Sequence, residues 1–253
     1  MANLLVIDIG NTSISYGIIK SGRLRHYFYD IDDNFPKMRN FIVKSGIIRI
    51  IDKVIISSVN PKKLAKLLPI LSKRGWSKNL LIIGRQLTPK IKHKYSHINK
   101  LGKDRLVNIY GALRWYSKPT LIINFGTAMT VDVISKKGIY EGGLIIPGIE
   151  TSWKALQARA ALLPKGIPIK DYKGFLGRDT EACMQAGILQ GFGAMVDGLI
   201  GRFQARYGKS LFVLASGGLA KKVRPYIKSQ VKVDGTHPIK SLALIYQDHL
   251  KNK

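Results

Sequence analysis

Two short polar loops of the same kind occur in this chain, one in each half, and each follows directly after a run of apolar residues. The first loop, residues 8–13 (DIGNTS), follows the run 4–7, and the second, residues 124–130 (NFGTAMT), follows the run 121–123. Glycine and small hydroxylated residues in such a turn leave backbone N–H groups accessible, so that a phosphate group can approach closely. The repetition predicts a duplicated α/β fold that binds a nucleotide between its halves.

The spacing of apolar residues predicts strands and helices on both sides of a boundary near Ser117. Before it we expect strands over 4–8, 14–19, 23–29, 54–56 and 80–83, and helices over 36–43, 61–71 and 104–116. After it we expect strands over 121–125, 130–134 and 211–215, and helices near 150 and over 180–207, the last rich in Ala and Gly and therefore tightly packed or broken. The segment after Val231 shows no distinctive pattern. The predicted halves are residues 1–117 and 118–253.

The composition limits the surroundings and the partners of the protein. The chain has 42 Lys and Arg against 15 Asp and Glu, a net charge of +27, which attracts polyanions such as nucleotides and nucleic acids; the alternative is a solvated, lysine-rich surface. No run approaches the roughly 20 apolar residues of a membrane helix, and the N-terminus shows no signal peptide. The single cysteine, Cys183, excludes an intramolecular disulfide. We therefore expect a cytosolic protein without a membrane partner, and a packed Cys183 thiol.

Asp8 stands at the end of the first apolar run, beside the glycine of the first loop. A carboxylate in this position can hold Mg²⁺, or a water on it, against the phosphates of a nucleotide. The alternative is a turn residue that hydrogen-bonds to its own backbone. The matching loop in the second half favours the phosphate-binding interpretation.

Asp104 and Arg105 lie side by side at the start of a predicted helix, in the sequence Gly102-Lys103-Asp104-Arg105. Asp104 could simply cap the helix. The functional hypothesis is that Asp104 accepts a proton from a hydroxyl that attacks phosphorus, while Arg105 binds an anionic group of the substrate. Phosphoryl transfer depends mainly on positioning and charge neutralisation, so one carboxylate and two phosphate-binding loops can suffice.

Several motifs, in the same order along the chain, resemble those of the type III pantothenate kinases, also called the Bvg accessory factor-like family. The matching segments are Asp8–Thr12, Ser57–Pro61, Gly102–Arg105, Gly126–Ala128, Gly142–Gly148, Gly177–Thr180 and Gly217–Ala220. The resemblance implies the α/β fold of the actin, Hsp70 and sugar-kinase superfamily, in which two RNase H-like halves enclose a nucleotide. It also implies the reaction of ATP with pantothenate to give ADP and 4′-phosphopantothenate, the first step of coenzyme A biosynthesis.

The resemblance implies a role for individual residues. The ATP-binding residues would be Asp8, Ile9, Gly10, Asn11, Thr12, Ser13, Ile14, Ser15 and Thr127, with Asp8 near the Mg²⁺ ion of ATP. The pantothenate-binding residues would be Tyr95, Gly102, Lys103, Asp104, Arg105 and Thr180, with Asp104 as the catalytic proton acceptor. Thr180 would reach its substrate across the contact of a homodimer.

The family uses a monovalent cation, K⁺ or NH₄⁺, in addition to ATP and Mg²⁺. Relatives carry Asp as a ligand of this cation where the present chain has Asn124. An amide oxygen can still coordinate K⁺, although without the negative charge. Two further hypotheses stay open at this point. One is a catalytically weakened regulator associated with nucleic acid through its basic surface, and the other is a kinase of the same fold that acts on a different small alcohol.

Overall fold

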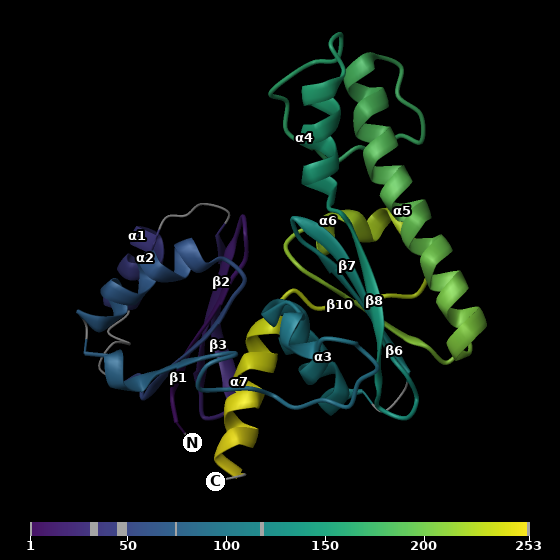
Figure 1. The fold of residues 1–253 in the computed structure, drawn as a ribbon. Helices are drawn as coiled ribbons and strands as arrows, with labels where there is room; N and C mark the ends of the chain where they lie inside the picture. Colours follow the sequence, from purple (N-terminus) through teal and green to yellow (C-terminus); the bar gives the residue numbers. More distant parts are fainter. Residues whose placement is uncertain (1, 31–34, 45–49, 74, 117–118, 252–253) are drawn as a thin grey trace. The chain divides into compact units, whose positions relative to one another are not determined.

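Two five-stranded sheets with equivalent strand orders form the core of the structure (Figure 1). The computed structural model describes residues 2–30, 35–44, 50–73, 75–116 and 119–251. Contacts divide the chain into two units. The N-terminal unit comprises Met1–Ile91, Ser96–Trp115 and Thr236–Lys253, and the C-terminal unit comprises Lys92–Tyr95 and Tyr116–Gly235. The predicted division after residue 117 instead assigns Thr236–Lys253 to the C-terminal half and Lys92–Tyr95 to the N-terminal half. Ser117 and Lys118 themselves lie outside the described residues.

The sheet of the N-terminal unit has the order β3-β2-β1-β4-β5. Its strands are β1 (Leu4–Ile9), β2 (Ile14–Lys20), β3 (Arg23–Asp30), β4 (Lys53–Ser58) and β5 (Leu80–Ile82). The first three strands are antiparallel neighbours, whereas β4 and β5 run parallel to β1. The parallel arrangement brings the ends of β1 and β4 to the same edge of the sheet, where Asp8 and Ser57 are register partners.

Helices cover both faces of this sheet, which explains why β1 is apolar at almost every position. On one face, Leu5, Ile7 and Ile9 pack with side chains of α1 (Phe35–Lys44) and α2 (Pro61–Ser72). On the other, Leu4 and Val6 pack with α3 (Lys103–Trp115) and the C-terminal helix α7 (His237–Lys251). The predicted strands and helices are confirmed here to within a few residues, and Asn60 caps α2 by accepting a hydrogen bond from Lys63 N at 3.0 Å.

Helix α7 belongs to the N-terminal unit because it packs closely against α3. A Cβ atom on Gly111 of α3 would overlap the Ser241 side chain of α7, so only glycine permits this approach. The side chains of Ile239, Leu242 and Ile245 complete the core on this face of the sheet. The segment after Val231, for which the sequence shows no distinctive pattern, contains a two-residue strand and this fifteen-residue helix.

The sheet of the C-terminal unit has the order β10-β9-β6-β7-β8. Read from β8 to β10, this order is equivalent to that of the first sheet read from β3 to β5. Its strands are β6 (Thr120–Phe125), β7 (Ala128–Ile134), β8 (Tyr140–Pro147), β9 (Phe212–Ser216) and β10 (Lys232–Val233). Its helices are α4 (Ile149–Arg159), α5 (Thr180–Tyr207) and α6 (Ala220–Val223). Strand β6 takes the place of β1, β7 that of β2 and β9 that of β4, with the same directions of pairing. The predicted duplication is therefore confirmed.

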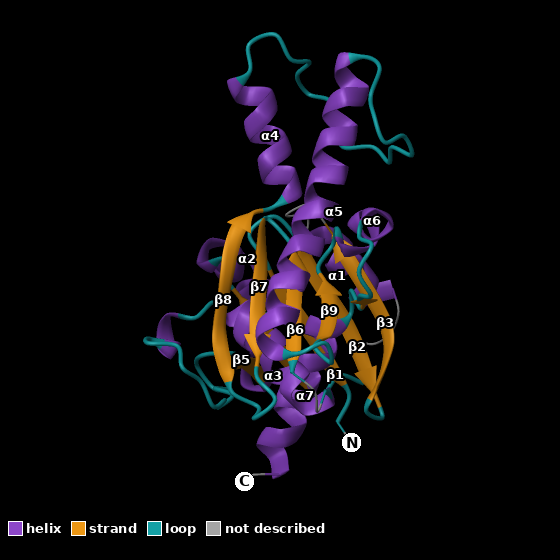
Figure 2. Cartoon of the chain, turned by 90° about the vertical axis from the view of Figure 1, so that its right-hand side faces the viewer, coloured by secondary structure: helices purple, strands orange, loops and turns teal. Residues whose placement is uncertain are grey.

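Helix α5 is continuous over 28 residues, so the break considered for its Ala- and Gly-rich sequence does not occur. Leu189, Phe192 and Val196 pack it onto the core of the C-terminal unit. Figure 2 shows that α4 and the first turns of α5 extend beyond the end of the sheet, joined by the loop 160–179. Among the helices of the described residues, none has the combination of length and apolar character that crossing a bilayer requires.

Candidate active site

The first glycine loop is a tight connection between β1 and β2. Gly10 N donates a hydrogen bond to Ser13 O at 2.9 Å, and a Cβ on Gly10 would lie 3.1 Å from the same oxygen. Asp8 pairs in register with Ser15, and Ile9 with Ile14. The structure thus brings all eight residues predicted to bind ATP phosphates, 8–15, into one hairpin, with Asn11 and Thr12 exposed at its tip.

One oxygen of the Asp8 carboxylate is buried without a hydrogen-bond partner of standard geometry in the part of the chain that the structure describes. This Oδ1 atom and Ser57 Oγ are both inaccessible to solvent, and neither has a hydrogen-bond partner of standard geometry among the described residues. Burial raises the pKa of Asp8 to about 7, the negative charge of Asp104 adds to the rise, and Ser57 opposes it. A buried carboxylate oxygen without a donor is costly in the ligand-free protein, and carboxylate oxygens are the ligands that Mg²⁺ prefers. The site therefore fits a divalent cation.

Asp104 lies in the first turn of α3, and its carboxylate curls back toward the preceding glycine. Its Oδ1 atom accepts a hydrogen bond from Arg105 N at 2.8 Å. A Cβ on Gly102 would lie 2.6 Å from the same oxygen, so a side chain at Gly102 would displace the carboxylate. Burial raises the pKa of Asp104, while the N–H group and the charge of Arg105 oppose the rise. A carboxylate with a raised pKa is a stronger base than an ordinary one.

The N-terminal unit thus brings two acids together at the ends of β1 and the start of α3, together with Ser57 and the buried Arg105. The neighbouring Lys103 lies over a turn, because a Cβ on Gly84 would be 2.7 Å from Lys103 Cε. Burial raises the pKa of both carboxylates, and the charge of Asp104 raises that of Asp8 further; carboxylates with raised pKa values are typical of catalytic sites. Ser57 was not predicted as a site residue, although it belongs to one of the motifs that carry the resemblance.

The second glycine loop, Gly126–Thr127, joins β6 to β7 in the C-terminal unit. Gly148 N donates to Thr127 O at 2.9 Å, and Thr151 Oγ1 donates to the same oxygen at 2.6 Å. A Cβ on Gly148 would overlap the carbonyl groups of Gly126 and Thr127. The close approach of these backbones explains why the Pro147-Gly148 turn accompanies the loop.

Asn124 precedes this loop and lies beside a third glycine turn. Gly217 has a φ angle of +91°, and a Cβ there would lie 2.5 Å from Phe125 O and 2.8 Å from Asn124 Oδ1. The amide oxygen and the carbonyl oxygen are therefore next to each other. Neutral oxygen atoms of this kind are suitable ligands for a monovalent cation, although the described residues contain no cluster of three His, Cys, Asp or Glu side chains that could hold a metal ion.

Tyr95 is held in the C-terminal unit by Tyr140, the first residue of β8. The two rings are 5.7 Å apart and inclined by 30°. Tyr140 also pairs with the backbone on either side of His93, through Tyr140 N to Lys92 O and Lys94 N to Tyr140 O, both at 2.9 Å. The buried Tyr140 hydroxyl donates to Asp132 Oδ1 at 2.8 Å. Sequence reasoning missed Tyr140 and Asp132; an acid within the apolar run of β7 was the available signal.

Thr180 is exposed at the first position of α5, next to the cap residue Asp179, which accepts a hydrogen bond from Ala182 N at 2.8 Å. The expectation that the Cys183 thiol is packed was wrong, because Cys183 is exposed. The structure therefore places Asp8, Asp104 and Arg105 in one unit, and Tyr95, Asn124, Thr127 and Thr180 in the other.

Comparison with solved structures shows the class of fold. A Campylobacter jejuni protein named as a Baf family transcriptional activator superposes with a TM-score of 0.60 at 17% identity, over 98% of this chain and 99% of that one. A glucokinase from an Antarctic psychrotroph superposes with a TM-score of 0.52 at 10% identity, over 98% and 99% of the two chains. At these identities the likeness concerns the fold alone. The chain has the duplicated fold of the actin-like and sugar-kinase ATPases.

Sequence comparison identifies the family. Residues 4–202 match the type III pantothenate kinase family. A type III pantothenate kinase of Syntrophus aciditrophicus is 34% identical over 252 residues, which cover 96% of this chain and 98% of that protein. The chain therefore belongs to the type III pantothenate kinase family, and the resemblance of its motifs is confirmed. It is a phosphotransferase by family, and no observation favours the hypothesis of a nucleic-acid-associated regulator.

Proposed function

We propose that this protein transfers the γ-phosphoryl group of ATP to the primary hydroxyl group of pantothenate, giving ADP and 4′-phosphopantothenate. The observation that carries the proposal is the pair of partly buried acids, Asp8 and Asp104, in a chain of this kinase family. Asp104 accepts the proton of the attacking hydroxyl, since its buried carboxylate has a raised pKa and lies beside Asp8. Arg105 binds the carboxylate of pantothenate through its planar guanidinium group.

Asp8 and the two glycine loops hold the phosphates of ATP. When bound, Mg²⁺ neutralises the negative charge of the transferring phosphoryl group, and Asp8 holds the ion directly or through a water. Backbone N–H groups at the tip of the first loop, residues 11–13, and that of Thr127 bind phosphate oxygens in the manner of an anion-binding nest. The tight Gly10–Ser13 connection and the contact of Gly148 with Thr127 support this, because both fix the backbone in place before ATP binds.

The remaining pantothenate contacts come from Tyr95, Gly102, Lys103 and, in a homodimer, from Thr180 of the other subunit. The support for a dimer is the exposure of three large apolar residues in the loop 160–179, which precedes α5. Leu162, Phe175 and Leu176 are 97%, 75% and 74% exposed, which is unusual for large apolar side chains. A second subunit that covered them would also meet the exposed Thr180. We place the enzyme in the cytoplasm, where its single cysteine would stay reduced.

Because Asn124 stands in place of a carboxylate, we expect the protein to bind its monovalent cation weakly but still to require it. Its Oδ1 atom and Phe125 O supply oxygen ligands without negative charge. Replacing Asn124 with Asp adds a carboxylate, so we expect the K⁺ concentration for half-maximal activity to fall about tenfold, equal to about 1.4 kcal/mol of cation binding. The measurement is a K⁺ titration of activity at constant ionic strength, with Asn40→Asp, at an exposed position of α1 outside the proposed site, as the matched control. An unchanged K⁺ dependence would remove Asn124 from the cation site.

Tyr140 is expected to position Tyr95 without touching substrate. Tyr140→Phe removes the hydrogen bond to the buried Asp132 carboxylate and loosens the segment that carries Tyr95. We expect the KM for pantothenate to rise about tenfold, while kcat and the KM for ATP change less than about threefold. Steady-state kinetics with each substrate varied in turn provides the test. The control is Tyr207→Phe, a change in α5 of the same unit; equal effects of the two substitutions would contradict the positioning role.

The proposed reaction is tested by ADP release with ATP alone, with pantothenate, and with other primary alcohols, each in K⁺ and in Na⁺ buffers. We expect ADP release to depend on pantothenate, and the product mass to correspond to pantothenate plus one phosphoryl group. Release that requires a different alcohol would assign the protein to another substrate. ATP binding without any turnover, together with salt-sensitive retention of DNA, would instead support the regulator.

A further inference from the structure

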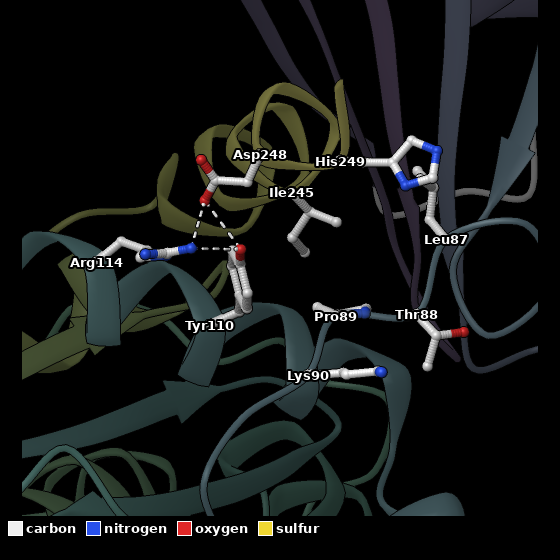
Figure 3. A pocket seen from close by; sticks show the side chains of 9 residues that line it. All are labelled: Leu87, Thr88, Pro89, Lys90, Tyr110, Arg114, Ile245, Asp248 and His249. Carbon is white, nitrogen blue, oxygen red and sulfur yellow. Dashed lines mark hydrogen bonds and ion pairs between the residues drawn. The ribbon is translucent and has the colours of Figure 1, made fainter. Parts of the chain in front are cut away.

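A pocket of about 440 Å³ lies in the N-terminal unit, apart from the acid pair. Three segments line it: the chain after β5, one face of α3 and one face of α7 (Figure 3). The lining residues are Leu87, Thr88, Pro89, Lys90, Tyr110, Arg114, Ile245, Asp248 and His249. We refer to it as the α3–α7 pocket. Its volume lies within the range of about 300–1,000 Å³ that is usual for small-molecule sites.

One side of the α3–α7 pocket is a fixed polar cluster. Tyr110 OH donates to Asp248 Oδ2 at 2.9 Å, and Arg114 Nη2 lies 3.1 Å from the same carboxylate oxygen and 3.2 Å from the tyrosine oxygen. The Arg114 guanidinium group also lies over the Tyr110 ring, 5.3 Å from its centre. These contacts join α3 to α7 and hold Arg114 in place, so its remaining N–H groups are oriented before any ligand arrives.

The middle of the pocket is apolar, and its other side is polar again. Figure 3 shows Ile245 and Pro89 between the polar cluster and a second group that contains Thr88 and His249. Ile245 and Leu87 are buried, whereas Thr88 and Lys90 are exposed. A ligand in this pocket therefore meets apolar side chains in the centre and hydrogen-bond donors at the edge.

The charges of the lining are unbalanced. Lys90 and Arg114 are cationic and His249 gains a charge on protonation, whereas Asp248 is the single carboxylate among the nine residues and is already paired with Arg114. The net charge of +27 on the whole chain strengthens the positive potential. Such a lining favours an anion, and Arg and Lys donors suit carboxylate and phosphate groups.

The proposed phosphoryl transfer does not use this pocket. Tyr110 and Arg114 come six and ten residues after Asp104, which is about 9 and 15 Å further along α3 at 1.5 Å per residue. The pocket and the acid pair are nevertheless on the same helix. A ligand that bound Lys90 and Arg114 together would tie the chain after β5 to α3, the helix that positions Asp104.

We propose that the α3–α7 pocket binds a small organic anion, with a carboxylate or phosphate group at the cationic side chains and an apolar part against Leu87, Pro89 and Ile245. This site is independent of the proposed kinase reaction. It would hold its ligand whether or not the protein phosphorylates pantothenate.

The experiment follows backbone amide NMR signals of the full chain during titration with phenyl phosphate, benzoate and inorganic phosphate, with ATP and Mg²⁺ present to fill the nucleotide site. We expect phenyl phosphate or benzoate to shift the amides of Thr88, Lys90 and His249. We also expect the better of them to bind at least about tenfold more tightly than inorganic phosphate, which lacks the apolar part. Whichever of phenyl phosphate and benzoate binds more tightly shows whether the site prefers a phosphate or a carboxylate group.

The charge requirement is tested with two matched variants that each remove one lysine charge from the N-terminal unit. Lys90→Gln should weaken binding of the preferred probe at least about tenfold, whereas Lys20→Gln, at an exposed position at the end of β2, should leave it unchanged. Thermal denaturation verifies that both variants fold. The proposal is overturned if the amide shifts occur only around residues 8–15, or if the two variants bind the probe equally well.

Discussion

Replacing Asp104 with Asn is expected to lower kcat by about 10²–10⁴-fold, the usual contribution of a general base. Asparagine keeps the size of the side chain and can still accept the hydrogen bond from Arg105 N, so the start of α3 should stay intact. It cannot take a proton from the hydroxyl of pantothenate. The KM for ATP should change little, because in the proposed site the phosphates are held by the hairpin of residues 8–15 and by Thr127.

The matched control for this substitution is Asp52→Asn, which removes one exposed carboxylate from the same unit. Its kcat should equal that of the unchanged protein. Initial rates of ADP formation, with pantothenate and ATP both saturating, provide the measurement for both variants. A loss smaller than tenfold in Asp104→Asn would reject the role of this residue as the proton acceptor.

Replacing Asp8 with Asn is expected to stabilise the ligand-free protein while it destroys activity. The pKa of Asp8 is raised from 3.8 to about 7 on folding, so the folded state favours the protonated carboxyl group. Its contribution to stability is therefore full below pH 3.8 and is lost as the pH rises toward 7. At pH 8 the buried charge costs up to about 4 kcal/mol of the free energy of unfolding, and Asn carries no such charge.

Urea denaturation at several pH values measures this effect. We expect Asp8→Asn to be more stable than the unchanged protein by about 1–4 kcal/mol at pH 8, and the difference to shrink steadily toward pH 4. Adding ATP and Mg²⁺ at pH 8 should stabilise the unchanged protein more than the variant, since the variant lacks the carboxylate proposed to hold the ion. A variant that is less stable at pH 8 would show that the Asp8 carboxylate is well solvated or paired in the folded protein.

Local signals in the sequence were sufficient for most of the fold. Strands β1 and β6 are continuous apolar runs because helices or neighbouring strands cover them, and each ends in a glycine loop that a sequence pattern reveals. The pairing of the two loops predicted the duplication, and it is confirmed by the equivalent strand orders of the two sheets. The sequence also identified residues 102–105 as a candidate site segment, because an acid and an arginine at the start of a helix, just after a glycine, form a recognisable group.

Features that depend on contacts between distant segments could not be predicted. Helix α7 joins the N-terminal unit through the packing of Ser241 against Gly111. The sequence around each of these residues contains no signal that predicts the contact. The Tyr140–Asp132 hydrogen bond and the stacking of Tyr95 likewise bring together residues from three separate segments. Cys183 is exposed although the next three residues of α5, Met184, Gln185 and Ala186, are buried, and the composition of this stretch does not reveal which of its side chains face outward.

The proton-accepting role of Asp104 is tested most directly by a crystal structure of the protein with pantothenate and a non-hydrolysable ATP analogue. We expect a carboxylate oxygen of this residue about 2.6–3.2 Å from the primary hydroxyl of pantothenate, with that hydroxyl facing the terminal phosphate of the analogue. A carboxylate that instead points into bulk solvent, with the hydroxyl closer to some other base, would contradict the mechanism.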